Sequence, residues 1–326
     1  MKNSGYFYAK IMLFGEYGVI LGSQVLSIPY THFIGELSFL DDDKYTDLDY
    51  ATESNANLGK YLHHLKSNQI TGNASHILDL AKMEADIQNG IFFESSIPQG
   101  YGIGSSGALV AALYQRYAVN PIQSHSRILS SEIMQLKEIF ASLESYFHGK
   151  SSGLDPLNSY LQFPLHMVDS QSINLVGIPR HKFEGPGAIF LIDSGMTGKT
   201  ATYVESFLER CNETAFNTAV RNTYIPLTNL CISDLISGNM SGFFANLKLL
   251  SQFQFTHFQP MIPTNYREVW DAGNQSGDYH LKLCGSGGGG FILGFTRDFE
   301  RAAAKLKSSG IDIIPVYKSD DKKYLN

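Results

Sequence analysis

A glycine- and serine-rich segment stands between the alternating run IFFESSI (91–97) and an apolar run in which Leu109, Leu113 and Tyr117 recur at helical spacing. The segment contains a G-x-G-x-x-G pattern and two adjacent serines. Glycines permit a tight loop, and unpaired N–H groups at the start of a helix attract anions. Serine hydroxyls there can coordinate a phosphate oxygen or its metal. The segment predicts a phosphate loop, with a plain strand-to-helix turn as the alternative. The loop consists of Gly102, Ile103, Gly104, Ser105, Ser106 and Gly107.

Two common nucleotide-binding loops do not fit the sequence. A dinucleotide-binding motif requires a strand that ends in an acidic residue about 20 residues after the glycines. Residues 123–132 instead contain a turn-like stretch and the start of a second helix. A P-loop at Gly198, Lys199 and Thr200 would need a glycine five positions before Gly198, where Asp193 stands. The sequence context therefore argues against the first loop, and the spacing excludes the second.

Three further segments place reactive side chains in order along the chain. AKIMLFGEYGVILG (9–22) contains Lys10, and KLCGSGGGG (282–290) ends in a glycine run. Between them, HGKSSGLD ends at Asp155, eleven residues after Glu144. In phosphoryl transfer the protein mainly positions the reactants and neutralises phosphate charge. A lysine, two carboxylates and a phosphate loop are groups suited to that chemistry.

Together with PQGYGIGSSGA, these segments resemble the motif set of the GHMP small-molecule kinases, which include galactokinase and the homoserine, mevalonate and phosphomevalonate kinases. The family's phosphate loop is P-x-x-x-G-L-G-S-S-A-A, and here Ile103 replaces Leu and Gly107 replaces Ala. The Pro-Gly that precedes the lysine in the family's first motif is missing before Lys10. The resemblance implies ATP and Mg²⁺ as cofactors, with the ATP phosphates over residues 102–107 and a small-molecule alcohol as the substrate.

The resemblance also implies a role for each matching side chain. Asp155 would be the base or hydroxyl-orienting carboxylate, and Lys10 would be its partner. Ser106 and Glu144 would supply oxygen ligands for Mg²⁺. Because Pro156 follows Asp155, we expect an extended rather than helical backbone at the aspartate. The implied substrate-binding residues are Glu16, Tyr17, Gly287 and Gly288.

The motifs point to more than one acceptor alcohol. HGKSSGLD with Glu144, and LIDSGMTGKTATYV (191–204), resemble mevalonate kinase, which converts mevalonate to 5-phosphomevalonate in isoprenoid biosynthesis. GEY at residues 15–17 and SSGA at 105–108 look more like phosphomevalonate kinase. Mevalonate is the first expectation, with phosphomevalonate or another small alcohol as alternatives. A catalytically silent nucleotide or metabolite sensor is disfavoured, because the lysine, serine and both carboxylates are present.

The expected elements that position these residues alternate between strands and helices. We expect strands at 9–14, 24–29, 35–40, 91–97, 187–195, 290–295 and 311–317, and helices after the phosphate loop, over 131–148, over most of 198–258 and over 297–308. This pattern indicates a protein of mixed α and β structure. The resemblance implies a two-domain α+β GHMP kinase fold, with a ribosomal-protein-S5-like N-terminal domain (1–180) and a ferredoxin-like C-terminal domain (181–326).

Composition narrows the range of partners and compartments. The 326 residues carry a net charge of −6 without a basic run, so we expect no nucleic acid or anionic membrane as a partner. Cys211, Cys231 and Cys284 lack metal-ligand spacing and are expected to be reduced thiols. No stretch of 18 apolar residues and no leader pattern stands out, so a cytoplasmic location is expected. A homodimer is left open.

Overall fold

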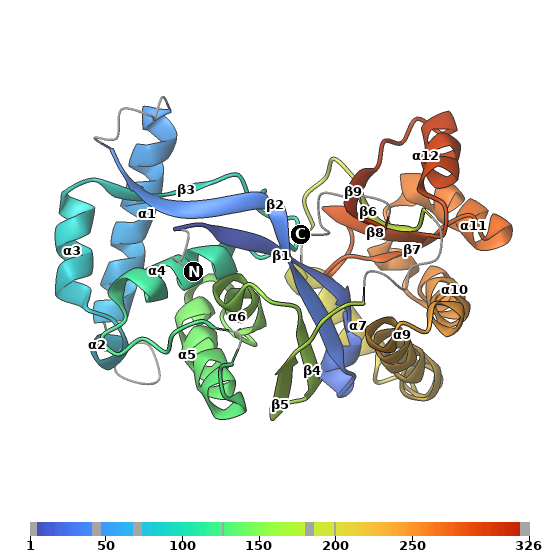
Figure 1. Ribbon diagram of the computed structural model, residues 1–326, viewed down its shortest axis with the longest axis horizontal. Coiled ribbons are helices and arrows are strands. Elements are labelled where there is room, and N and C mark those ends of the chain that lie inside the picture. Colours follow the sequence, from blue (N-terminus) through green and yellow to red (C-terminus); the bar gives the residue numbers. More distant parts are fainter. Residues whose placement is uncertain are drawn as a thin grey trace. The chain divides into compact units, whose positions relative to one another are not determined.

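The structure is a computed structural model, and it describes residues 5–40, 47–67, 74–125, 127–179, 186–198 and 200–319. The chain divides into two compact units (Figure 1). Unit 1 comprises Met1–Lys10, Ile28–Pro98 and Ile103–Phe163. Unit 2 comprises Ile11–Ser27, Gln99–Gly102 and Pro164–Asn326. The predicted domain boundary at 180/181 lies outside the described residues and stays a prediction.

Unit 1 combines antiparallel strands with a cluster of helices. Strands β2 and β3 pair with Gly35 opposite Ser95 and Phe39 opposite Ile91. Helix α4 packs against α5 and α6, and α5 in turn packs against α6. The elements that contribute to unit 1 are β1 (Phe7–Phe14), β2 (Val25–Phe39), α1 (Leu48–Lys66), α2 (Ala74–Ile77), α3 (Leu80–Gln88), β3 (Ile91–Ser95), α4 (Ser105–Tyr117), α5 (Ser130–His148) and α6 (Leu154–Leu161).

Helix α5 follows the expected pattern closely. Its residues Ile133, Leu136, Phe140 and Leu143 are all buried, as their alternating spacing of three and four predicts for one face of a helix. The helix ends before Gly149, which lies at a positive φ of 71°. Because this face is buried, the rotation of α5 about its axis is fixed, and with it the position of Glu144, which follows Leu143.

Unit 2 contains a four-stranded antiparallel sheet in the order β7-β8-β6-β9. Helices α10 and α11 pack against β7 (Figure 1). The first residues of β2 pair with β4, and β4 pairs with β5. Its elements, besides parts of β1 and β2, are η1 (Gly18–Leu21), β4 (Leu165–Asp169), β5 (Ser172–Leu175), β6 (Ala188–Asp193), α7 (Thr200–Arg210), α8 (Thr214–Ala219), η3 (Val220–Tyr224), α9 (Ile225–Ser237), α10 (Met240–His257), η4 (Gln259–Met261), η5 (Thr264–Tyr266), α11 (Arg267–Ser276), β7 (His280–Leu283), β8 (Phe291–Thr296), α12 (Phe299–Ser308) and β9 (Ile314–Lys318).

The α+β class is confirmed, and so is the strand-helix-strand tail formed by β8, α12 and β9. The two strands expected at 24–29 and 35–40 are wrong as separate elements, because β2 runs unbroken from Val25 to Phe39. Gly35 does not turn the chain. A Cβ atom at Gly35 would lie 2.2 Å from Cζ of Phe93 on β3, so glycine provides room for that ring within a continuous strand.

Two further observations bear on the class of protein. Among the described residues, no helix is both long and apolar enough to span a membrane. Among the described residues, no two cysteines form a disulfide; Cys231 and Cys284 are buried and Cys211 is partly exposed.

Candidate active site

Only residues 102–104 of the predicted phosphate loop precede helix α4, and residues 105–107 form the first turn of the helix. Gly104 is the N-cap residue, in the left-handed region with φ 81° and ψ 39°. A Cβ atom there would lie 3.0 Å from Cγ of Lys10 and 3.6 Å from Oδ2 of Asp155. The backbone N–H of Lys10 also donates to the carbonyl of Ile103 at 2.9 Å. The helix N-terminus, the lysine and the aspartate therefore meet around Gly104, and the N-terminus of a helix favours an anion.

Lys10 and Asp155 form an ion pair inside unit 1. Lys10 Nζ lies 3.0 Å from Asp155 Oδ1, and the side-chain exposures are 5% and 30%. The lysine is buried along β1, whereas the carboxylate keeps access to solvent. Such an arrangement fixes the direction of the carboxylate and leaves it reachable by a small molecule.

The expectation of an extended backbone at Asp155 is wrong, because the residue lies in the first turn of α6. Gly153, with φ 74°, is the N-cap of this helix, and Asp155 and Pro156 follow within its first turn. Proline is tolerated there because the N–H groups of the first turn have no partner within the helix in any case. The carboxylate is consequently held by a helix rather than by a loop.

Gly107 explains how α4 and α6 come close enough to bring their first turns together. A Cβ atom at Gly107 would lie 2.7 Å from both the carbonyl carbon of Asp155 and the nitrogen of Pro156. Both are backbone atoms, which cannot give way without moving a helix. Glycine at this position lets the phosphate loop pack directly against the segment that carries Asp155.

Glu144 lies beside the same loop. Ser106 Oγ donates to Glu144 Oε1 at 2.9 Å, and Ser151 Oγ donates to Oε2. Glu144 is only 3% exposed. Burial, reinforced by the negative charge of Asp155, raises the pKa of Glu144 from its ordinary 4.5 to about 7. Hydrogen bonds from Ser151 and Ser106 and the charge of Lys10 lower the pKa, but they do not cancel the effect of burial.

The Ser106 and Glu144 oxygens fit a magnesium ion. Two neighbouring ligands on an octahedral Mg²⁺ with bonds of about 2.0–2.1 Å are separated by about 2.9 Å, which matches the 2.9 Å between Ser106 Oγ and Glu144 Oε1. Within the described ranges, no group of three or more His, Cys, Asp or Glu side chains could hold a metal. Mg²⁺ commonly uses one or two protein oxygens and completes its shell with phosphates and water.

The predicted substrate residues lie in unit 2, around the glycine run. Lys282 Nζ forms a 2.6 Å ion pair with Glu16 Oε1, and both side chains are at most 2% exposed. The Tyr17 hydroxyl donates to the carbonyl of Ser286. Burial is the main cause that raises the Tyr17 pKa well above its ordinary value, so the hydroxyl stays protonated. Glu16 and Tyr17 thus both contact the segment that leads into the glycine run.

The glycine run itself is tightly packed. A Cβ atom at Gly287 would lie 2.5 Å from the carbonyl of Met261, and one at Gly288 would lie 2.0 Å from the ring of Tyr203. Both glycines have positive φ, near 70°. This segment therefore requires glycine for conformation as well as for space.

The structure gathers the predicted residues into two groups. Unit 1 brings together Lys10, Gly104, Ser106, Gly107, Glu144 and Asp155, and unit 2 brings together Glu16, Tyr17, Gly287 and Gly288. That both groups serve one substrate stays a prediction. Sequence reasoning missed Ser151, which sits at a variable position of HGKSSGLD, and Lys282 as the partner of Glu16, because their contacts follow from folding.

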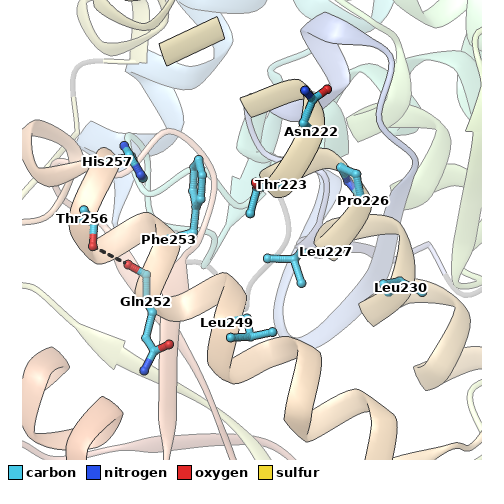
Figure 2. Close-up of a pocket in the computed structure, with 10 residues that line it drawn as sticks. All are labelled: Asn222, Thr223, Pro226, Leu227, Leu230, Leu249, Gln252, Phe253, Thr256 and His257. Atoms are coloured by element: carbon cyan, nitrogen blue, oxygen red, sulfur yellow. Dashed lines mark hydrogen bonds between the residues drawn. The ribbon is translucent and has the colours of Figure 1, made fainter. Parts of the chain in front are cut away.

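A separate cavity of about 430 Å³ lies between η3 and α9 on one side and α10 on the other (Figure 2). Leu227, Leu230, Leu249 and Phe253 supply much of its lining, and Thr256 donates a hydrogen bond to the carbonyl of Gln252 at 3.0 Å. It contains none of the predicted site residues.

Comparison with known proteins gives the same fold. The description "GHMP kinases N terminal domain" matches residues 68–162 and "GHMP kinases C terminal" matches residues 231–312, together more than half of the chain. No curated protein sequence matches significantly.

Several solved structures share the architecture at low identity. Mevalonate kinase from L. major, in complex with R-mevalonate, is 16% identical with a TM-score of 0.58, covering 94% of this chain and 92% of that one. Streptococcus pneumoniae phosphomevalonate kinase, in complex with phosphomevalonate and AMPPNP, is 13% identical with a TM-score of 0.60, covering 96% and 98%. Lactococcus lactis galactokinase, complexed with galactose, is 14% identical with a TM-score of 0.60, covering 96% and 93%.

At these identities the neighbours establish the fold and leave the substrate unresolved. The expected two-domain α+β fold is confirmed by the N- and C-terminal domain matches and by these structures. The chain belongs to the GHMP kinase family, whose members generally catalyse ATP-dependent phosphorylation of small molecules.

Proposed function

We propose that this protein transfers the γ-phosphoryl group of ATP to the hydroxyl of mevalonate, giving 5-phosphomevalonate and ADP. The observation that carries the phosphotransferase part is the cluster in unit 1. There the Lys10–Asp155 ion pair lies beside the N-cap of α4, and Ser106, in the first turn of that helix, pairs with Glu144. The cluster offers a phosphate cradle, a carboxylate for the acceptor hydroxyl and a pair of metal ligands.

Each group has a defined task in this proposal. The N–H groups at the start of α4 bind phosphate oxygens, and Lys10 neutralises charge that builds up on them. Asp155 orients the acceptor hydroxyl and accepts its proton as the new oxygen–phosphorus bond forms and the bond to the ADP oxygen breaks. Mg²⁺, held by Ser106 and Glu144, would supply further neutralisation of phosphate charge when bound.

The choice of mevalonate rests on sequence. HGKSSGLD with its upstream Glu144 favours mevalonate, whereas GEY at residues 15–17 and SSGA at 105–108 favour phosphomevalonate. Structural neighbours include one complex with each of these two compounds. Phosphomevalonate is therefore the second candidate.

A coupled ADP-release assay with ATP and Mg²⁺ distinguishes the candidates. Mevalonate, phosphomevalonate, galactose and homoserine are offered separately to the purified full-length chain. Turnover on mevalonate alone supports the proposal, and turnover on phosphomevalonate alone replaces mevalonate by the second candidate. ATP binding without turnover on any acceptor would contradict both.

The proposed phosphate site at residues 102–107 can be tested by adding one methyl group at Gly104. Gly104→Ala places a Cβ atom 3.0 Å from Lys10 Cγ and strains a residue at φ 81°. We expect the Kd for ATP to rise at least about 10-fold, equivalent to about 1.4 kcal/mol. Gly277→Ala is the matched control, because Gly277 is also left-handed, at φ 72°, but has no atom within 4 Å of the added methyl. Equal ATP affinities for the two variants would remove residues 102–107 from the nucleotide site.

Glu144→Gln tests the metal role and the burial of the carboxyl together. We expect the Mg²⁺ concentration for half-maximal rate to rise about 10-fold or more, because a carboxylate ligand is lost. A pKa raised above 4.5 means that the folded, metal-free protein loses stability as pH rises towards 7. The metal-free variant should therefore have a higher Tm than the native protein at pH 8, with the difference vanishing at pH 4. An unchanged magnesium titration would contradict the ligand role.

A further inference from the structure

The loop between α5 and α6 turns the side chain of Ser151 back towards Glu144. Ser151 Oγ donates to Glu144 Oε2 and accepts the backbone N–H of Gly153 at 3.0 Å. The loop lies directly on α5, since a Cβ atom at Gly153 would be 2.2 Å from the carbonyl oxygen of Lys137 and 2.8 Å from the nitrogen of Ala141. The backbone N–H of Gly153, two residues further along the same turn, thus holds the hydroxyl of Ser151 in place.

The two oxygens of Glu144 have different partners. Oε1 accepts from Ser106, the other proposed metal ligand, at 2.9 Å, and Oε2 accepts from Ser151. A hydrogen bond to the second oxygen makes it a weaker ligand and so favours binding of a cation through the first oxygen, whose hydrogen-bond partner Ser106 would itself turn its oxygen to the metal. Substituting a group that orients a metal ligand in this way typically lowers the metal affinity or the activity by about 10- to 100-fold.

We propose that Ser151 is a positioning residue that keeps Glu144 a one-oxygen ligand and so favours Mg²⁺ over Ca²⁺. Mg²⁺ requires near-octahedral geometry with single oxygens at about 2.0–2.1 Å, whereas Ca²⁺ accepts six to eight oxygens at about 2.3–2.6 Å and often takes both oxygens of one carboxylate. The inference rests on the proposed metal role of Ser106 and Glu144. It concerns a position that the motif H-G-x-x-S-G-x-D leaves variable, since the serine of that motif is Ser152.

Two nearby serines have hydrogen-bond partners that differ from those of Ser151. Ser152 is exposed, and its Oγ accepts the N–H of Leu154 at 3.3 Å. Ser145 follows Glu144 directly on α5, and its Oγ donates to the carbonyl of Ser142 at 2.6 Å. Ser145→Ala is therefore a matched control, since it removes the same hydroxyl close to Glu144 without removing a hydrogen bond to the carboxylate.

Calorimetric binding of two metal–nucleotide complexes tests the proposal without turnover. The Mg²⁺ and Ca²⁺ complexes of AMPPNP, a non-hydrolysable ATP analogue, are titrated into the full-length native chain and its variants. For Ser151→Ala we expect the affinity for the Mg²⁺ complex to fall about 10-fold and that for the Ca²⁺ complex to fall less than about 3-fold. Ser151→Thr, which keeps a hydroxyl, should restore the native ratio, and Ser145→Ala should leave it unchanged.

The outcomes separate this proposal from the one on which it rests. If Glu144→Gln weakens the Mg²⁺ complex but Ser151→Ala leaves the Mg²⁺/Ca²⁺ ratio unchanged, the role of Ser151 is overturned and the metal site stands. If Glu144→Gln has no effect on either complex, the metal site fails and the role of Ser151 fails with it. A thermal melt of each variant checks that the fold is retained.

Discussion

Asp155→Asn should lower kcat by about 10²- to 10⁴-fold, the range usual for removing a general base, while leaving the fold and the Kd for ATP nearly unchanged. Asparagine has the same shape and can still accept a hydrogen bond from Lys10, whose Nζ lies 3.0 Å from the carboxylate. It cannot accept the proton of an acceptor hydroxyl. The single-turnover rate with saturating ATP and acceptor isolates this loss from any change in binding.

Asp86→Asn is the control for this substitution. Asp86 also belongs to unit 1 and also pairs with a cation, Arg116 Nε at 2.8 Å, but the pair lies away from the phosphate loop, between α3 and α4. This variant should keep native turnover. Equal kcat values for Asp155→Asn and the native protein would remove Asp155 from the catalytic step.

Lys282→Met should destabilise the protein by about 3–5 kcal/mol, because it leaves the buried Glu16 carboxylate without its cation. The lysine is fully buried, and its Nζ donates both to Glu16 Oε1 and to the carbonyl of Leu283, each at 2.6 Å. Both oxygens would lose a charged donor at a buried position. Urea unfolding followed by circular dichroism measures the free energy of unfolding.

The exposed pair Lys307–Asp312 provides the comparison. Its side chains are 68% and 80% exposed, so Lys307→Met should change stability by less than about 1 kcal/mol. The double variant Glu16→Gln with Lys282→Met should be more stable than Lys282→Met alone, since no unpaired charge remains. A loss below about 1 kcal/mol for Lys282→Met would show that this pair does not hold the GEY segment to β7.

Buried hydrogen bonds also connect Glu16, one of the predicted substrate residues, to β7. Tyr224 donates to the carbonyl of Glu16 at 2.9 Å, and Gln254 donates to the Tyr224 hydroxyl at 3.0 Å. The Gln254 side chain in turn accepts the N–H of Leu283 at 2.8 Å. A chain of hydrogen bonds therefore connects the GEY segment to the strand that precedes the glycine run, entirely within unit 2.

Much of the secondary structure was predictable because its signals are local. The alternating three- and four-residue spacing on α5 depends on helical geometry alone, and the buried faces of Ile133 to Leu143 follow from it. The glycines before α4 and the serines that begin it likewise predict a loop and the start of a helix. Local signals failed at Asp155, where Pro156 suggested an extended chain. Proline is also tolerated in the first turn of a helix, because the N–H group that it lacks would have no partner there.

The sequence by itself determined the mixed α and β composition, the order of the motifs and the identity of the candidate groups for phosphoryl transfer, because these depend on residue types and short spacings. Only the tertiary structure decided that Glu144 is buried, that Ser151 holds one of its oxygens, and that Gly107 lets α4 approach Asp155. It also decided the pairing of Glu16 with Lys282, 266 positions apart. Close packing between distant segments sets which groups lose water and which partners they meet, and no periodicity along the chain encodes that.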